Sequence, residues 1–438
     1  MDKIIINGGK KLYGEVEISG SKNAALPILI ATLLTDEKCI IKNVPLLEDI
    51  NTSIALLKHL GKKIRREKNE ITILSNGVTR TDAPYQLVSK MRASILVAGP
   101  LLSRFKKAEI SLPGGCAIGL RPINIHIDGL TKLGARYSIF HGKVKIIAKK
   151  LKGSKIVLDF PSVGATENLL MASVLIDGET VIENCATEPE ITDLANFLIN
   201  IGAKISGIGT KYLKITGVKK LHGCEYKIIP DRIETGTFII ASAITSGNIK
   251  IVGATTEDNE ALIEKIKLTG SSVNVARGFI LAEKDDVVPR FIGAKKDCLK
   301  IKCPSIIKPV DIETAVYPGF ATDLQPMWMV LMTVAMGESI VTETIFENRF
   351  QTSQELIKMC ANIKIKGNSA IIKGVKNLAG AKVVASDLRS AAALILAGLS
   401  TKGRTEITGL EYLDRGYENI VGKLKKLGAD IKRTCQII

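Results

Sequence analysis

The sequence has 438 residues, of which 46% are hydrophobic and 24% are charged, and its formal net charge is +17. A chain of this length and composition is too long for one ordinary core and too apolar for a disordered protein, so two or three domains are expected. Its apolar runs, such as 28–34 and 327–336, are shorter than the ~20 residues that cross a bilayer. We therefore expect a cytoplasmic protein without a membrane anchor.

The cysteines and histidines are scattered along the chain. None of the eight cysteines is in Cys-x-x-Cys spacing, and the four histidines are far apart in sequence. Walker A and Gly-x-Gly-x-x-Gly patterns are absent from the sequence. We therefore expect neither a disulfide framework, nor a metal, nor a bound cofactor.

The excess of basic residues fits either an acidic partner or a lysine-rich surface. Basic residues are spread along the chain and aromatic residues make up only 4%, which argues against a platform for single-stranded nucleic acid. We expect no nucleic-acid partner, although a small anionic ligand remains open.

One α/β unit repeats six times. In each copy an apolar helix with small residues leads into a turn and a short strand, and an amphipathic helix that usually ends near a glycine follows. The helix ends recur at positions 61, 134, 202, 270, 361 and 428, roughly 70 residues apart. The fourth interval is longer by about twenty residues, and the insertion is expected within 284–318. Three units in each of two domains is the natural division, with a ligand in the cleft between the domains.

Polar or charged residues open the first helix of every unit, where capping explains most of them. Capping does not explain Lys22, Arg92 and Arg389, because a cation at a helix N-terminus opposes the helix dipole. Such a cation is tolerated when an anion lies between it and the helix end. These three residues therefore indicate an anion-binding site.

The loop 112–122 follows a predicted strand and holds three glycines, two prolines and Cys116. Several cations lie close to Cys116 in sequence, and positive neighbours lower the pKa of a thiol and make it reactive. The alternative is that Cys116 is a small apolar residue. Asp323, in segment 318–326, is either a helix cap or a general base. We expect Asp231–Arg232 and Asp414–Arg415 to be solvated ion pairs.

From residue 1 to about residue 430, the chain resembles the UDP-N-acetylglucosamine 1-carboxyvinyltransferase family. The motifs that carry the resemblance include GSKNAALPIL (20–29), MRASI (91–95), SLPGGCAIGLRP (111–122), SVGAT (162–166), PDRIETGTF (230–238), TDLQ (322–325), TETIFENRF (342–350), SDLR (386–389) and DRGYE (414–418). The cysteine-bearing loop and GSKN, in place of GSKS, distinguish the chain from the sister enzyme 5-enolpyruvylshikimate-3-phosphate synthase.

The resemblance implies a two-domain inside-out α/β barrel, in which each domain is built of three βαβαββ units. One domain would contain residues 22–229 and the other residues 1–21 and 230–438, with the active site in the cleft between them. We expect a monomer that binds only small molecules and no membrane.

The implied reaction transfers the enolpyruvyl group of phosphoenolpyruvate to the 3′-hydroxyl of UDP-N-acetylglucosamine and releases phosphate, the first committed step of peptidoglycan synthesis. In it, Cys116 is the general acid and Asp323 the base. The phosphate and carboxylate are held by Lys22, Arg121 and Arg389, and Arg415 adds positive charge. The positions that match the UDP-N-acetylglucosamine site are Lys22, Asn23, Arg92, Arg121, Pro122, Ile123, Asn124, Ile125, Ser162, Val163, Asp323 and Ile345.

Two positions depart from the family pattern. Asn124 stands where many members have Asp, and Phe160 stands where a Lys often contacts the diphosphate. We expect these changes to alter the affinity for the nucleotide, not the reaction. The alternatives are a transferase like 5-enolpyruvylshikimate-3-phosphate synthase, a non-catalytic paralogue that binds a UDP-sugar, and a basic nucleic-acid binder.

Overall fold

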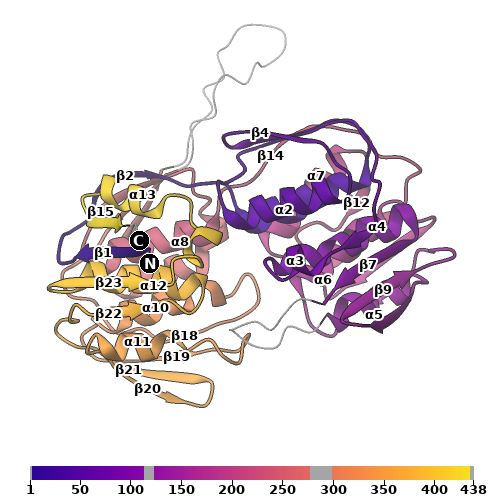
Figure 1. The fold of residues 1–438 in the computed structure, drawn as a ribbon. Helices are drawn as coiled ribbons and strands as arrows, with labels where there is room; N and C mark the ends of the chain where they lie inside the picture. The colour runs from indigo at the N-terminus through magenta and orange to yellow at the C-terminus, as the bar shows by residue number, and fades with distance from the viewer. Residues whose placement is uncertain (1, 113–122, 277–297, 435–438) are drawn as a thin grey trace, which may run out of the picture. The chain divides into compact units, whose positions relative to one another are not determined.

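The computed structural model describes residues 2–112, 123–276 and 298–434 (Figure 1). The chain divides into two compact units. The N-terminal unit contains described residues of 20–229, and the C-terminal unit contains residues 2–19 and the described residues from 230 onward. Among the helices described, none combines the length and the apolar character that a membrane span needs.

The described residues form six four-stranded sheets, three in each unit. Each sheet has one parallel strand pair and two antiparallel pairs. In the N-terminal unit the sheets are β14(Glu225–Lys227)-β3(Cys39–Lys42)-β5(Glu70–Ile73)-β4(Ile64–Glu67), β6(Asp82–Ala83)-β7(Lys107–Ser111)-β9(Lys143–Ile147)-β8(Arg136–Phe140) and β10(Lys155–Val157)-β11(Glu179–Glu183)-β13(Tyr212–Thr216)-β12(Lys204–Ser206). In the C-terminal unit they are β16(Ser272–Ala276)-β17(Cys298–Lys302)-β15(Asn248–Val252)-β2(Tyr13–Glu17), β18(Ile312–Glu313)-β19(Glu338–Thr342)-β21(Ser369–Lys373)-β20(Asn362–Lys366) and β22(Lys382–Val384)-β23(Arg404–Thr408)-β1(Lys3–Asn7)-β24(Asp430–Thr434).

The first helix of each repeat is almost entirely buried. In the C-terminal unit, α8 (Arg232–Ile244), α10 (Gln325–Met332) and α12 (Leu388–Ser400) pack against one another (Figure 1). In the N-terminal unit, α1 (Lys22–Ala31), α4 (Ala98–Phe105) and α6 (Val163–Ser173) are the buried helices. Most residues of these helices are small or apolar, and the polar ones among them, such as Glu167 and Asn168 of α6, are buried as well, as expected for helices that are surrounded by protein.

The amphipathic helices bury one face only, and they lie outside these buried helices. They are α2 (Glu48–His59), α5 (Asn124–Lys132), α7 (Pro189–Asn200), α9 (Glu260–Leu268), α11 (Thr352–Lys358) and α13 (Ile420–Lys426). With buried helices inside and sheets outside, the predicted inside-out α/β fold of three repeats per unit is confirmed.

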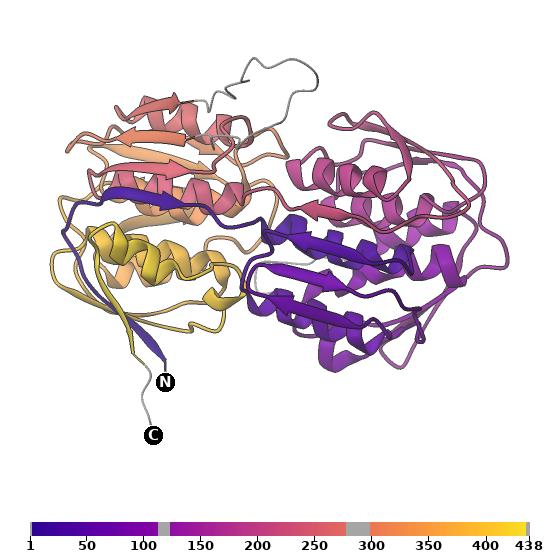
Figure 2. The same cartoon turned by 90° about the horizontal axis from the view of Figure 1, so that it is seen from above.

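Within the described segments, the chain passes between the units at 19–20 and at 229–230. Within the C-terminal unit the Asp231 N–H donates to the Ser19 carbonyl (2.9 Å), and within the N-terminal unit the Ser21 N–H donates to the Ile229 carbonyl (2.8 Å). Strand β1 lies beside β24, so both ends of the described chain belong to one sheet (Figure 2). The N-terminal strands β1 and β2 therefore complete sheets of the C-terminal unit.

The repeat markers predicted from the sequence have the expected backbone conformation. Gly61, Gly134, Gly202, Gly270 and Gly428 all have positive φ. In the fifth repeat the positive φ (66°) belongs to Cys360, one residue before the predicted position. Part of the range 284–318, in which an insertion was expected, contains β17 and β18. The first part of that range, up to residue 297, lies outside the described residues.

Candidate active site

In the C-terminal unit, Asp323 lies between two arginines. Its Oδ1 accepts a hydrogen bond from Arg349 Nη2 (2.6 Å), and its Oδ2 accepts one from Arg389 Nη2 (2.9 Å). The arginine side chains are only 3% and 6% exposed, whereas that of Asp323 is 28% exposed. Solvent and small molecules therefore reach this cluster at the carboxylate.

Burial is the largest single effect and opposes the charge of Arg389, but Asp323, Tyr417 and Asp231 together outweigh it and raise the pKa of Arg389. Arg389 consequently remains a cation inside the unit, able to bind an anion by a planar, two-pronged contact.

Helix α12 and the residues around it hold Arg389 in place. The Asp387 carboxylate caps α12 by accepting from the Arg389 and Ser390 N–H groups (2.8 and 3.1 Å). Arg389 Nη1 donates to the Tyr417 hydroxyl (3.2 Å), which is also hydrogen bonded to Thr237 Oγ1 of α8 (2.8 Å). The guanidinium is thus fixed from two directions before any ligand binds.

Ile345 is connected to the Asp323 segment through the buried carboxylate of Glu343. Glu343 Oε1 accepts from the Ile345 N–H (2.8 Å), and its Oε2 accepts from the Thr322 hydroxyl (2.9 Å). Thr322 and Asp323 belong to the short helix η4 (Thr322–Leu324). Glu343 therefore sets the position of two neighbouring segments, each of which carries a predicted site residue.

For two acids of the C-terminal unit, the structure shows partners other than the neighbouring arginines that were expected. Asp231 is buried and caps α8, because its Oδ1 accepts from the Ile233 and Glu234 N–H groups (2.8 and 3.0 Å). Asp414 pairs with Arg433 (2.6 Å), a residue of β24 far along the chain. Adjacency in sequence misled both predictions, since neighbouring side chains rarely face each other. Arg415 itself is half-buried in η5 (Leu413–Arg415).

In the N-terminal unit, Lys22 and Asn23 are the first two residues of α1. Ser21 caps this helix by accepting from the Ala24 N–H (3.3 Å). Lys22 Nζ lies 3.2 Å from Asp49 Oδ2 in the first turn of α2, and the two side chains are 12% and 6% exposed. The lysine is therefore largely desolvated and held close to the start of two helices.

A second group of predicted site residues gathers where three helices begin. Arg92 is the first residue of η2 (Arg92–Val97), Asn124 is the first of α5, and Val163 is the first of α6 after its cap Ser162. Helix α6 packs against both α5 and η2. Ile123 and Ile125, which flank Asn124, pack partly against the core. The structure thus brings Arg92, 123–125 and 162–163 to one region of the unit.

His126 belongs to this region, although no motif predicted a role for it. It is buried, and its Nδ1 lies 3.1 Å from the Asn168 side-chain nitrogen. A Cβ added to Gly164 would come within 3.2 Å of the His126 ring, which places the imidazole close to the start of α6. Burial and the positive charge of Arg92 lower the pKa of His126 to about 4. The ring is therefore neutral near pH 7.

Three predicted site residues, Cys116, Arg121 and Pro122, lie outside the described residues. Phe160 is 44% exposed, and Asn124 is exposed as well. The residues that the predictions missed, apart from His126, are Arg349, Tyr417 and Asp49. Arg349 and Tyr417 occur in the motifs TETIFENRF and DRGYE, so the motifs contained them without revealing their contacts.

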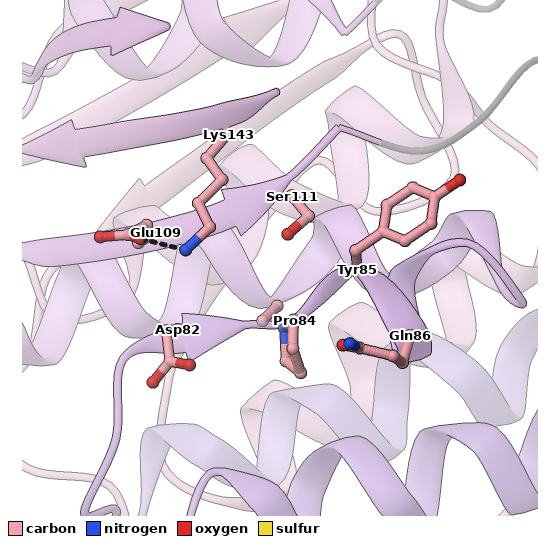
Figure 3. A pocket seen from close by; sticks show the side chains of 8 residues that line it. Asp82, Pro84, Tyr85, Gln86, Glu109, Ser111 and Lys143 are labelled. Atoms are coloured by element: carbon pink, nitrogen blue, oxygen red, sulfur yellow. Dashed lines mark hydrogen bonds and ion pairs between the residues drawn. The ribbon is translucent and has the colours of Figure 1, made fainter. Parts of the chain in front are cut away.

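A separate pocket of about 260 Å³ lies in the N-terminal unit beside β6, β7 and β9 (Figure 3). Two acids on its wall already have cationic partners: Glu109 pairs with Lys143 (3.0 Å) and Asp82 with Arg80 (3.0 Å). Among the residues that the structure describes, no predicted site residue lines this pocket. The described site residues therefore lie elsewhere.

The comparisons with known proteins agree on one class of relative. The model of the EPSP synthase (3-phosphoshikimate 1-carboxyvinyltransferase) family matches residues 6–424. The chain is 50% identical over 433 residues to UDP-N-acetylglucosamine 1-carboxyvinyltransferase of Geotalea uraniireducens, covering 99% of both chains. It is 49% identical to the enzyme of the same name from Endomicrobium trichonymphae, again over 99% of both.

Solved structures share the fold at lower identity. The enolpyruvyl transferase NikO from Streptomyces tendae has a TM-score of 0.84 at 24% identity, covering 99% of both chains. EPSP synthase from Acinetobacter baumannii has a TM-score of 0.76 at 19% identity, covering 100% of both chains. At these identities the likeness supports the fold alone.

Proposed function

The chain belongs to the UDP-N-acetylglucosamine 1-carboxyvinyltransferase family of transferases, and we propose that it transfers the enolpyruvyl group of phosphoenolpyruvate to the 3′-hydroxyl of UDP-N-acetylglucosamine. The sugar hydroxyl first adds to phosphoenolpyruvate to form a tetrahedral intermediate. Elimination of phosphate from this intermediate then gives the product. The product would commit the sugar nucleotide to peptidoglycan synthesis. Relatives that bear this enzyme name span the whole chain, which supports the assignment.

One structural observation carries the proposal: the Asp323 carboxylate is held between the guanidinium groups of Arg349 and Arg389. The reaction needs a base for the sugar hydroxyl and cations for a highly charged phosphate ester, and this cluster contains both. We propose that Asp323 removes the hydroxyl proton when an anionic group of phosphoenolpyruvate competes for Arg389.

The remaining roles follow from the reaction. Lys22, Arg121 and Arg389 would bind the phosphate and carboxylate of phosphoenolpyruvate, with Arg415 adding positive charge. Cys116 would donate the proton that the methylene carbon gains on addition. The UDP-N-acetylglucosamine would contact Asn23, Arg92, the segment 121–125, Ser162, Val163 and Ile345. These assignments require groups from both units to act on one pair of substrates, which stays a prediction.

The test is a phosphate-release assay with phosphoenolpyruvate and two alternative acceptors. We expect release with UDP-N-acetylglucosamine and little with shikimate 3-phosphate. The opposite preference would support the sister activity. Release with neither acceptor, while UDP-N-acetylglucosamine still binds in calorimetry, would support a non-catalytic sugar-nucleotide-binding protein.

A second measurement tests whether Asn124 and Phe160 affect nucleotide affinity or the reaction itself. If they alter only nucleotide affinity, Asn124→Asp and Phe160→Lys change the KM for UDP-N-acetylglucosamine and leave kcat close to that of the unchanged protein. A large change in kcat would mean that these positions influence the reacting groups.

A further inference from the structure

Two cysteines face each other across neighbouring strands of the N-terminal unit. Strand β14 lies at the edge of its sheet and pairs in parallel with β3, with Glu225 opposite Ile40. The Ile40 N–H donates to the Cys224 carbonyl (2.9 Å). Cys39 is the residue before Ile40, and Cys224 is the residue before Glu225. The register therefore places Cys39 and Cys224 side by side.

Both cysteine side chains point to the same side of this sheet. Cys39 is fully buried in the core of the unit, and Cys224 is half-buried and packs against the same core. The backbones come close here, since a Cβ added to Gly223 would collide with the Lys38 carbonyl. Adjacent strands lie about 4.8 Å apart, within the range of about 4.4–6.8 Å between Cα atoms that a disulfide spans.

The segment that leads to Cys224 is fastened to the chain just before Cys39. Glu37 Oε2 accepts from the Gly223 N–H (3.1 Å), and Glu37 Oε1 pairs with Lys220 (2.8 Å). These contacts keep the two thiols together without a covalent bond.

The surroundings also favour a thiolate within the pair. The hydrogen bond from Cys224 is the largest of the effects that lower the pKa of Cys39, and the positive charge of Lys62 acts in the same direction. Lys62 is buried and fixed, with its Nζ donating to the carbonyls of Thr35 (2.6 Å) and Asn76 (3.0 Å). The proton remains on the more exposed sulfur, because the same contact raises the pKa of Cys224.

We propose that Cys39 and Cys224 form a site of reversible oxidation, at which a low-molecular-weight disulfide converts the two thiols into an intramolecular disulfide. Cys224, which solvent reaches, passes its proton to the neighbouring Cys39 thiolate and attacks one sulfur of the small disulfide, forming a mixed disulfide and releasing a small thiolate. This small thiolate takes up the proton from Cys39. The Cys39 thiolate then attacks the Cys224 sulfur and releases the second small thiolate, which is protonated by water. The two cysteines lose two electrons and one proton, and the two electrons reduce the small disulfide.

The product would attach β14 covalently to β3. Strand β14 has three residues and ends two residues before the chain leaves the N-terminal unit at 229–230. The bond would close a loop of nearly the whole unit, so it should stabilise that unit by restricting its unfolded chain. Oxidation would thus act on the segment that connects the two units.

The experiment incubates the full-length protein with oxidised glutathione, blocks remaining thiols with an alkylating reagent and maps the peptides by mass spectrometry. We expect a linked peptide pair that contains Cys39 and Cys224, reversible with reduced glutathione, and a higher thermal unfolding temperature. Cys39→Ser should accumulate glutathione on Cys224, whereas Cys224→Ser should leave the buried Cys39 unmodified. Cys360→Ser, which alters an exposed cysteine elsewhere, should behave like the unchanged protein.

The proposal is wrong if Cys360 takes up glutathione while no Cys39–Cys224 link forms at any ratio of oxidised to reduced glutathione. It is equally wrong if Cys224 in the unchanged protein stops at the mixed disulfide. Because both thiols are free in the reduced protein, the phosphate-release assay on that form tests the proposed function separately.

Discussion

The buried helices of the two units begin differently. In the C-terminal unit, α8 and α12 are capped by Asp231 and Asp387, and each carboxylate accepts from two backbone N–H groups. In the N-terminal unit, α1 and α6 are capped by Ser21 and Ser162, and each hydroxyl accepts from one. A carboxylate cap supplies the negative charge that a helix N-terminus attracts, whereas a serine cap leaves that end positive.

This difference suggests that the two units have different roles in the reaction. In the C-terminal unit, the carboxylate caps offset the positive ends of α8 and α12. The Asp323 carboxylate of this unit pairs with two arginines of the same unit, Arg349 and Arg389. The N-terminal unit has serine-capped helices with Lys22 and Arg92 at nearby helix starts. We therefore propose that the C-terminal cluster removes the proton of the sugar hydroxyl and that the N-terminal one chiefly binds the nucleotide diphosphate.

The largest effect is expected from Asp323→Asn, which keeps the size of the side chain and removes its basicity. General-base catalysis typically contributes about 10²–10⁴-fold, so kcat should fall by that factor while UDP-N-acetylglucosamine still binds. Steady-state phosphate release and calorimetric binding measure the two quantities. Asp311→Asn, an exposed carboxylate of the same unit, is the matched control. Loss of nucleotide binding with unchanged kcat would move Asp323 out of the proton-transfer role.

Arg389→Lys tests whether the C-terminal cluster needs a guanidinium or only a positive charge. Lysine loses the simultaneous contacts to Asp323 and Tyr417. A hydrogen bond to a charged group contributes about 1.5–3 kcal/mol, so kcat/KM for phosphoenolpyruvate should fall about 10- to 100-fold. Arg433→Lys is the control, because Arg433 also pairs with carboxylates, those of Asp2 and Asp414, but is much more exposed. Equal losses in the two variants would contradict a specific role for Arg389.

Ser162→Asp gives an N-terminal helix the type of cap that the C-terminal unit uses. The added carboxylate should stabilise α6 by about 0.3–1 kcal/mol through the helix dipole. It should also repel a diphosphate and weaken UDP-N-acetylglucosamine binding about tenfold, or 1.4 kcal/mol. Ser162→Asn, a neutral cap, should bind like the unchanged protein. If the Asp variant binds the nucleotide normally, the diphosphate lies elsewhere.

Much of this architecture could be predicted from the sequence, because local patterns determine it. The recurring helix end with a glycine revealed six repeats, and polar residues at helix starts revealed the caps. Asp231 was assigned to a surface pair, and Arg349 and Tyr417 received no role. Their partners, such as Asp323 for Arg349, come from other parts of the chain, and no local pattern encodes such contacts. The Cys39–Cys224 pair, 185 residues apart, was missed for the same reason.

The smallest predicted effect is on thermal stability, and it involves one buried glutamate in each unit. Burial, together with the charges of Glu190 and Glu188, raises the pKa of Glu167 in α6 well above its ordinary value of 4.5. The folded state therefore holds a proton that the unfolded state releases, and the stability from this group is lost as the pH rises from 4.5 through the folded-state pKa. Glu167→Gln should leave the unfolding temperature unchanged near pH 4 and raise it increasingly towards neutral pH.

Glu234 of α8 is equally buried, but it pairs with Lys423 (2.6 Å). Burial raises the pKa of Glu234, and the lysine opposes that shift. Glu234→Gln leaves Lys423 without its buried carboxylate, so this variant should unfold at a lower temperature at neutral pH, the opposite sign to Glu167→Gln. Calorimetric scans of both variants from pH 4 to 8 measure the two trends. If both substitutions shift the unfolding temperature equally, burial alone determines their effect. The positive charge of Lys423 beside Glu234 would then make no measurable contribution to stability.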